Sequence, residues 1–158
     1  MSGIVAIHGN RAKNRTGKLQ EMLMRLRHRG PDQRNMYIGQ KIAVGHQSLH
    51  LSAIDERQPL SAGDGAMTLV CDAEIYNKNA LTDLKNKDMA EISDAAAIIN
   101  AYQQFGPACL KELDGMFAFV ICDEGEIFAA RDPLGILPLY WGKLNGQTLF
   151  ASELKALV

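Results

Sequence analysis

The order of the extended and helical segments limits what this chain can fold into more than any other feature. Apolar extended segments open and close the sequence, helical segments lie among them, and there is no regular strand–helix–strand alternation. Parallel sheets need a long crossover between successive strands, whereas antiparallel strands can be joined by short turns. We therefore expect an α+β fold of antiparallel sheets with segregated helices, formed by residues 1–158 as one domain.

Several extended segments are paired across short turn-forming stretches, as β-hairpins are. The expected hairpins join 36–38 to 42–44 around Gly39-Gln40, 116–122 to 126–130 around Glu124-Gly125, and 139–141 to 148–151. Further strands are expected at 3–8 and 66–71, with a loop over 49–65.

Apolar residues spaced as on one helical face predict a helix over residues 16–28, capped by Thr16 and stopped by Gly30-Pro31. A short helix is expected at 79–86, and a longer one begins where Ser93 or Asp94 can cap it. Ser152 is expected to cap a closing helical turn over 153–158.

Composition excludes several classes of protein. A chain of 158 residues with 47% hydrophobic residues can bury a core, and its net charge of −1 favours neither nucleic acid nor an anionic membrane as partner. No apolar run reaches the about 18 residues of a membrane span, and no signal peptide is evident, so we expect a cytoplasmic protein. Cys71 and Cys122 lie in strand-like runs and are expected in the core. His46 and His50 would suit a metal only on a helix, so we expect no metal and no cofactor.

Nine short strings, in order along the chain, carry a family resemblance. They are Ser2-Gly3-Ile4, Arg27 to Asp32 (RHRGPD), Gly45-His46, Gln58-Pro59-Leu60, Glu74 to Asn77 (EIYN), Leu113 to Phe119 (LDGMFAF), Ala130 to Ile136 (ARDPLGI), Pro138-Leu139-Tyr140 and Ala151 to Leu157 (ASELKAL). Together they resemble the N-terminal glutaminase domain of glutamine-dependent asparagine synthetases, a class II amidotransferase.

The resemblance implies a four-layer αββα sandwich of the N-terminal-nucleophile hydrolase type. In that family the domain hydrolyses glutamine to glutamate and ammonia, and the ammonia passes to an ATP-dependent synthetase domain. A synthetase domain beyond Val158, or a synthetase subunit in trans, is therefore the expected partner, and a homodimer is a further candidate assembly.

Ser2 stands where the family has a cysteine that is both nucleophile and N-terminus. A thiol ionises partly at neutral pH, whereas a serine hydroxyl is far less acidic. Hydroxyl nucleophiles do occur in related hydrolases, but they need a free α-amino group as base. That group would require the removal of Met1, which the small size of Ser2 permits.

Asp72 and Ala73 stand at the oxyanion-hole positions, where the family string reads Asn-Gly. An asparagine amide donates to the developing oxyanion, but an ionised aspartate only accepts and is negative. Loss of one such donor costs about 3 kcal/mol, and a charge in its place should cost more. Ala73 adds a Cβ where a close backbone approach or a positive φ is expected to need glycine.

The positions that hold glutamine in the family are changed in part. Ser48 lies where the family has an arginine for the α-carboxylate, and a serine offers no bidentate charged fork. Arg57, from a shifted loop, is a possible substitute. Glu74 falls in the retained EIYN string, and Asp94 matches the family residue that binds the α-amino group. Asp94 is also suited to capping the helix that starts beside it.

The scatter of these changes favours a degenerate amidotransferase domain that does not hydrolyse glutamine and has a structural or assembly role. The alternative is an active N-terminal serine amidohydrolase that acts on glutamine or another amide. A third hypothesis is a small-ligand sensor that uses the old pocket. The charged string Arg27-His28-Arg29, before Gly30-Pro31, is expected to brace its loop with Asp32.

Overall fold

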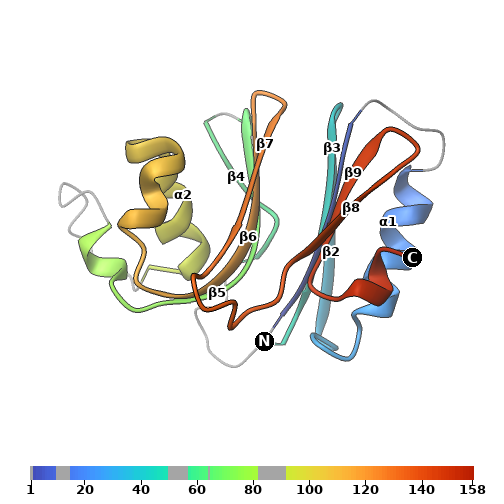
Figure 1. Cartoon of the computed structure of the whole chain (residues 1–158), viewed down its shortest axis with the longest axis horizontal. Coiled ribbons are helices and arrows are strands. Elements are labelled where there is room, and N and C mark those ends of the chain that lie inside the picture. Colours follow the sequence, from blue (N-terminus) through green and yellow to red (C-terminus); the bar gives the residue numbers. More distant parts are fainter. Residues whose placement is uncertain (1, 10–14, 50–56, 64, 82–91) are drawn as a thin grey trace.

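Two antiparallel sheets pack face to face, and one helix covers the outer face of each (Figure 1). A computed structural model describes residues 2–9, 15–49, 57–63, 65–81 and 92–158. The five-stranded sheet has the order β2 (Gln33–Ile38), β3 (Ile42–Ser48), β1 (Gly3–His8), β9 (Gln147–Ala151), β8 (Tyr140–Leu144). The four-stranded sheet has the order β4 (Leu60–Ala62), β5 (Met67–Ile75), β6 (Gly115–Asp123), β7 (Glu126–Arg131).

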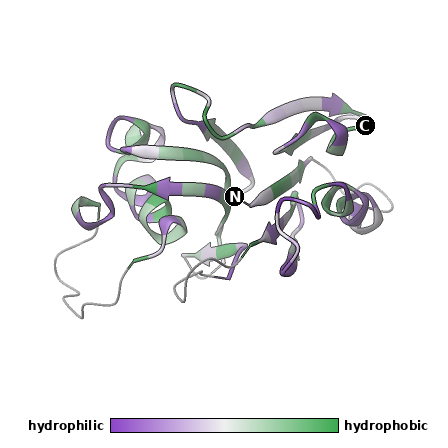
Figure 2. Ribbon diagram, turned by 90° about the horizontal axis from the view of Figure 1, so that it is seen from below, coloured by the Kyte–Doolittle hydropathy of each residue, from purple (hydrophilic) through white to green (hydrophobic). Residues whose placement is uncertain are grey.

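These layers confirm the predicted αββα sandwich. Hydrophobic residues run along the strands in the middle of the molecule (Figure 2). Along β1, Ile4 and Ala6 pack between the sheets, whereas Val5 and Ile7 pack under the helix on the other face. This two-residue alternation gives β1 two buried faces, so one short strand contributes to two cores.

Helix α1 (Arg15–Arg25) covers the five-stranded sheet with Leu19, Met22 and Leu23 buried. Leu23 packs against Gly45 of β3 so closely that a Cβ there would lie 2.6 Å from a Leu23 methyl group. The helix ends at Arg25, three residues before the predicted His28, and hydrogen-bonded turns continue to Arg29.

Helix α2 (Asp94–Phe105) covers the four-stranded sheet, and a 3-10 helix, η2 (Gly106–Lys111), follows it. Ser93 caps α2, since its side chain accepts a hydrogen bond from the Ala96 N–H at 3.0 Å. The prediction that this helix starts at Ser93-Asp94 is confirmed.

The three predicted hairpins are present, and most of their strands are longer than predicted. β4, at residues 60–62, lies inside the stretch expected to be a loop, so that expectation was wrong there. The predicted helix at 79–86 is a 3-10 turn, η1 (Lys78–Ala80), and its residues 82–86 lie outside the described residues, as do residues 50–56 of the expected loop.

The prediction for Ser152 was wrong. Its hydroxyl accepts a hydrogen bond from the Ile4 N–H at 2.9 Å, and its own N–H donates to the Ile4 carbonyl at 3.0 Å. The closing turn is a short 3-10 helix, η3 (Leu154–Ala156), without a side-chain cap. Ser152 therefore extends the β1–β9 pairing by one position, since Val5 pairs with Ala151.

The cysteines lie in the cores, as expected for Cys71 and Cys122, and Cys109 is buried too. Burial raises the pKa of the Cys109 and Cys122 thiols, which keeps them protonated and poorly reactive. In the described ranges, no helix combines the length and apolar character that crossing a membrane requires.

Candidate functional site

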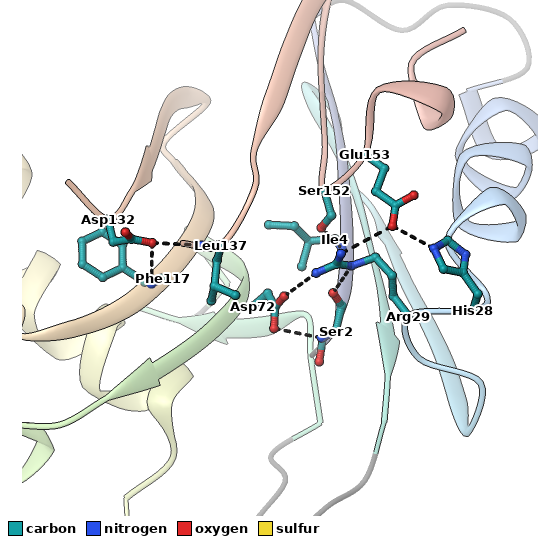
Figure 3. A network of polar contacts seen from close by, with 10 residues as sticks. All are labelled: Ser2, Ile4, His28, Arg29, Asp72, Phe117, Asp132, Leu137, Ser152 and Glu153. Carbon is teal, nitrogen blue, oxygen red and sulfur yellow. Dashed lines mark hydrogen bonds and ion pairs between the residues drawn. The ribbon is translucent and has the colours of Figure 1, made fainter. Parts of the chain in front are cut away.

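Ser2 lies just before β1, at the end of the sandwich where the two sheets meet. Its backbone N–H donates to Oδ1 of Asp72 at 2.8 Å, and its carbonyl accepts from Nε of Arg29 at 2.8 Å (Figure 3). The backbone of Ser2 is thus held from two sides, by a strand of the four-stranded sheet and by the turn after α1.

Asp72 projects from β5 toward the space between the sheets, because it shares that strand face with Val70. Its side chain is only 8% exposed, and its Oδ2 accepts from Nη2 of Arg29 at 3.0 Å. A buried carboxylate is costly unless it is paired and hydrogen-bonded, and here both oxygens have a donor. Asp72 is therefore a fixed, compensated negative charge.

Arg29 reaches this site because Gly30 lets its turn press against β3. A Cβ on Gly30 would lie 2.3 Å from the carbonyl oxygen of Gln47, so only glycine fits. Besides Ser2 and Asp72, Arg29 contacts Glu153, with Nη1 3.4 Å from Oε1. The string Arg27-His28-Arg29 was expected to brace its own loop, yet Arg29 contacts residues from both sheet regions.

Glu153 closes the network on the side of the C-terminal segment. Its Oε1 lies 2.8 Å from Nε2 of His28, and its Oε2 lies 3.1 Å from Nζ of Lys155. Burial alone would raise the pKa of Glu153, but these two partners outweigh it and hold the pKa below its ordinary value. The network thus joins residues from four separate parts of the chain (Figure 3).

Ala73 faces away from this network. Its methyl group packs on the core under α2, and it lies in the regular strand β5 opposite Phe117. It is not among the described residues with a positive φ.

Ser48 ends β3 and is buried, and its hydroxyl donates to the Gln33 carbonyl at 3.4 Å. The pairing of Gly3 with Gln47 places Ser2 and Ser48 at the same end of neighbouring strands. Arg57, the candidate substitute for the missing arginine, donates from Nε and Nη2 to Oδ1 of Asn35 at 3.4 Å. Asn35 lies on β2, two residues after Gln33, which pairs with Ser48.

Asp94 is engaged locally. Its Oδ1 accepts from the Ile75 N–H at 2.7 Å and lies 3.3 Å from Nζ of Lys78, while the capping role at α2 belongs to Ser93. Glu74 is exposed, and strand alternation puts it on the same face of β5 as Asp72.

The structure therefore brings Ser2 and Asp72 into contact and adds Arg29, which sequence reasoning missed as a site residue. The signal that could have found it is the RHRGPD string itself, one of the nine strings that carry the family resemblance. Among the described residues, no group of three or more histidine, cysteine or acidic side chains could hold a metal ion, and His46 lies on strand β3, not on a helix.

A family model described as a glutamine amidotransferase domain matches residues 1–158. The chain belongs to this family. The domain is 38% identical over 165 residues to asparagine synthetase [glutamine-hydrolyzing] 3 of Arabidopsis thaliana, covering 99% of this chain and 28% of that protein. It is 30% identical over 168 residues to asparagine synthetase [glutamine-hydrolyzing] 1 of Bacillus subtilis, covering 100% of this chain and 27% of that protein. The domain thus spans less than a third of the length of these relatives.

Solved structures support the fold of this amidotransferase domain. The glutamine phosphoribosylpyrophosphate amidotransferase of B. subtilis, complexed with ADP and GMP, superposes with a TM-score of 0.80 at 21% identity, over 98% of this chain and 42% of that one. A structure described as the allosteric regulatory enzyme of purine biosynthesis gives a TM-score of 0.79 at 20% identity, with the same coverage. The resemblance to a class II amidotransferase domain of the asparagine synthetase type, with the N-terminal-nucleophile hydrolase fold, is confirmed.

Proposed function

We propose that this amidotransferase domain, residues 1–158, does not hydrolyse glutamine at a useful rate and acts as a structural part of a synthetase. The observation that carries the proposal is the arrangement around Asp72, whose carboxylate is bound at once by the Ser2 N–H and by Arg29. The family's asparagine at this position is expected to donate a hydrogen bond to an oxyanion. Asp72 is instead an anion that already has two partners.

A negative charge at this point opposes catalysis for two reasons. An oxyanion that develops near Asp72 would be repelled, since both charges would lie in a site of low dielectric. The Arg29 guanidinium, which could otherwise attract that oxyanion, is already paired with Asp72 at 3.0 Å. Among the described residues, the Asp72 side chain thus offers an oxyanion no donor, and the Arg29 cation beside it is already paired.

Asp72 also weakens the α-amino group of Ser2 as a base for the Ser2 hydroxyl. If Met1 is removed, the new α-amino group occupies the place of the Ser2 N–H, 2.8 Å from a carboxylate oxygen. An opposite charge so close favours the protonated ammonium, which has no lone pair to take the hydroxyl proton. Processing of Met1 alone would therefore leave Ser2 poorly activated.

Incubation with glutamine tests the proposal. We expect no release of ammonia and glutamate above a matched Ser2→Ala variant, with the intact mass of both proteins measured to establish whether Met1 is present. Turnover that exceeds the Ser2→Ala control would overturn the proposal and support the alternative, an active N-terminal serine amidohydrolase.

The proposed partner is an ATP-dependent synthetase domain or subunit, either beyond Val158 or in trans. The relatives named as asparagine synthetases support this, because a stretch equivalent to this domain makes up only 28% of the Arabidopsis protein.

Large apolar side chains are exposed on the last part of the chain, including Trp141 on the edge strand β8 and Leu154 in η3. When this domain and the synthetase are expressed as two separate chains, we expect them to co-purify, and Trp141→Ser to weaken the association. A concentration-dependent mass in light scattering of the isolated domain would instead indicate a homodimer.

A further inference from the structure

The backbone nitrogen of Ser2 lies where a positive charge would be stabilised. Its hydrogen-bond partner, Oδ1 of Asp72 at 2.8 Å, belongs to a side chain that is only 8% exposed. In a chain that carries Met1 this nitrogen is a neutral amide. In a chain that begins at Ser2 it is an α-amino group, whose ordinary pKa is about 8. The same hydrogen bond therefore has a neutral and a charged form, and the presence of Met1 decides between them.

The backbone that carries this nitrogen is held in place by its neighbours. The Ser2 carbonyl accepts from Nε of Arg29 at 2.8 Å (Figure 3). Gly3 packs so closely on Leu26 that an added Cβ would lie 3.0 Å from the Leu26 Cβ. The Ile4 N–H donates to the Ser152 hydroxyl at 2.9 Å. An ion pair stabilises more when its partners are already in position, because little conformational entropy is lost in forming it.

The charges around Ser2 leave Asp72 able to bind a second cation. Arg29 divides its charge between two carboxylates, since Nη2 lies 3.0 Å from Asp72 and Nη1 lies 3.4 Å from Glu153. Arg29 would repel an ammonium group at Ser2, but Asp72 is in direct contact with that position and Coulomb energy falls with distance. The other titratable groups on the elements around Ser2 are His28, His46, Glu74 and Lys155.

The carboxylate of Asp72 is what makes the two forms of the bond differ. A hydrogen bond between an ammonium and a carboxylate is roughly twice as strong as one between neutral groups. With the ammonium present, Oδ1 of Asp72 binds one cation and Oδ2 binds another, Arg29. An asparagine, the residue that the family has here, offers only an uncharged oxygen and would gain much less from the change.

We propose that hydrolysis of the Met1–Ser2 bond creates a structural cation: in the chain that begins at Ser2, the α-ammonium group forms a buried ion pair with Asp72 and stabilises the junction of the two sheets. Hydrolysis breaks the amide bond, water supplies the second oxygen of the methionine carboxylate, and both hydrogens of that water end on the Ser2 nitrogen. The inference deepens the proposed function and rests on it in one respect, since an amine held in this pair is not the base of a glutaminase.

Thermal unfolding of two chains that differ only in Met1 tests the proposal. Each is released from an N-terminal fusion by a protease that leaves no extra residue, and intact mass verifies the first residue. At pH 6.5 we expect the chain that begins at Ser2 to unfold about 3 °C or more above the chain that begins at Met1. In an Asp72→Asn background this difference should fall to about 1 °C or less.

The pH dependence gives a second measurement that needs no substitution. Asp72 favours the protonated amine in the folded chain, so the folded chain keeps the proton to higher pH than the unfolded one. The stabilisation is therefore complete below the pKa of the unfolded amine, about 8, and is lost as the pH rises through the pKa of the folded amine. We expect the difference in unfolding temperature between the two chains to shrink by more than half from pH 6.5 to about pH 10.

Glu126→Gln is the matched control. It removes one carboxylate from the opposite end of the four-stranded sheet, where Glu126 is exposed and pairs with Asp123, and it should leave the effect of Met1 unchanged. Equal unfolding temperatures of the two chains at pH 6.5, a difference that Asp72→Asn leaves intact, or a difference that does not shrink at high pH would each overturn the inference. Glutamine turnover by the chain that begins at Ser2 would instead overturn the proposed function, whatever the unfolding temperatures are.

Discussion

The backbone N–H of Ser2 donates to Oδ1 of Asp72, a residue 70 positions away, at 2.8 Å. This bond joins the first residue of the five-stranded sheet region to the middle of the other sheet. Because Asp72 also pairs with Arg29, one carboxylate holds together the start of the chain, the turn after α1 and strand β5.

Asp72→Ala should therefore destabilise the fold by about 3 kcal/mol, since it takes from the largely buried guanidinium of Arg29 its closest ion-pair partner, at 3.0 Å against 3.4 Å for Glu153. Asp72→Asn keeps one oxygen acceptor and should cost less. Urea unfolding measures both values, and an Asp72→Ala variant as stable as the parent protein would contradict this account of the pair.

Restoring the family residues together should restore chemistry. Ser2→Cys, Asp72→Asn and Ser48→Arg combined should release ammonia from glutamine faster than the parent chain, whereas each single change should give little. Catalytic groups that act as a unit are strongly non-additive, so one repaired part leaves the others limiting. A triple variant that folds, has lost Met1 by intact mass, and still shows no turnover would show that further positions are needed.

The buried carboxylate of Asp132 should make the free energy of unfolding depend on pH at acidic pH. Burial alone would raise the pKa of Asp132, but the N–H groups of Ile136, Leu137 and Phe117 donate to it and hold the pKa below its ordinary value. The unfolded carboxyl thus takes up a proton at higher pH than the folded one. The contribution of Asp132 to the free energy of unfolding is complete above the pKa of the unfolded carboxyl, about 3.9, and is lost as the pH falls through the pKa of the folded one.

Asp132→Asn should accordingly lower the free energy of unfolding at pH 7 by about 3 kcal/mol, with a smaller difference from the parent protein below about pH 4. Urea unfolding at both pH values measures the difference. A gap between the two proteins that stays constant across this range would show that Asp132 is not the titrating group.

Two serine-to-alanine changes compare the stability lost with a buried hydrogen bond with the stability lost with a helix cap. Ser152→Ala leaves the buried Ile4 N–H without its side-chain acceptor and should cost about 2 kcal/mol. Ser93→Ala removes the cap of α2 and should cost about 1 kcal/mol. A smaller loss for Ser152→Ala than for Ser93→Ala, measured by thermal unfolding, would refute this ordering.

Local patterns in the sequence were enough to predict the hairpins, the α2 cap and the buried faces, because these depend on neighbours along the chain. β4 escaped prediction because three residues beside a proline carry no alternation that a pattern can show. Ser152 was misread for a related reason, since serine before a helical turn has the local features of a cap while its real partner, Ile4, lies 148 residues away.

The candidate site was predictable only in part. Ser2, Asp72 and Ser48 could be selected from departures in family strings, but the sequence does not show which residue neutralises Asp72. The residue is Arg29, which lies 43 positions from Asp72 in the sequence. A contact between such distant residues depends on how the two sheets pack. The oxyanion-hole role of Ala73 and the roles of Glu74 and Asp94 in glutamine binding stay predictions.

The position of β1 at the centre of the five-stranded sheet has a consequence for biosynthesis. Its two neighbours are β3 and β9, so this strand, the first of the described strands in chain order, pairs on one side with residues 42–47 and on the other with residues 148–151. Until those last residues emerge, one edge of this apolar strand has no partner from its own sheet. The nascent chain must therefore delay completion of the fold until synthesis has passed residue 151, and such sequence-distant pairing is slow and exposes apolar surface to aggregation.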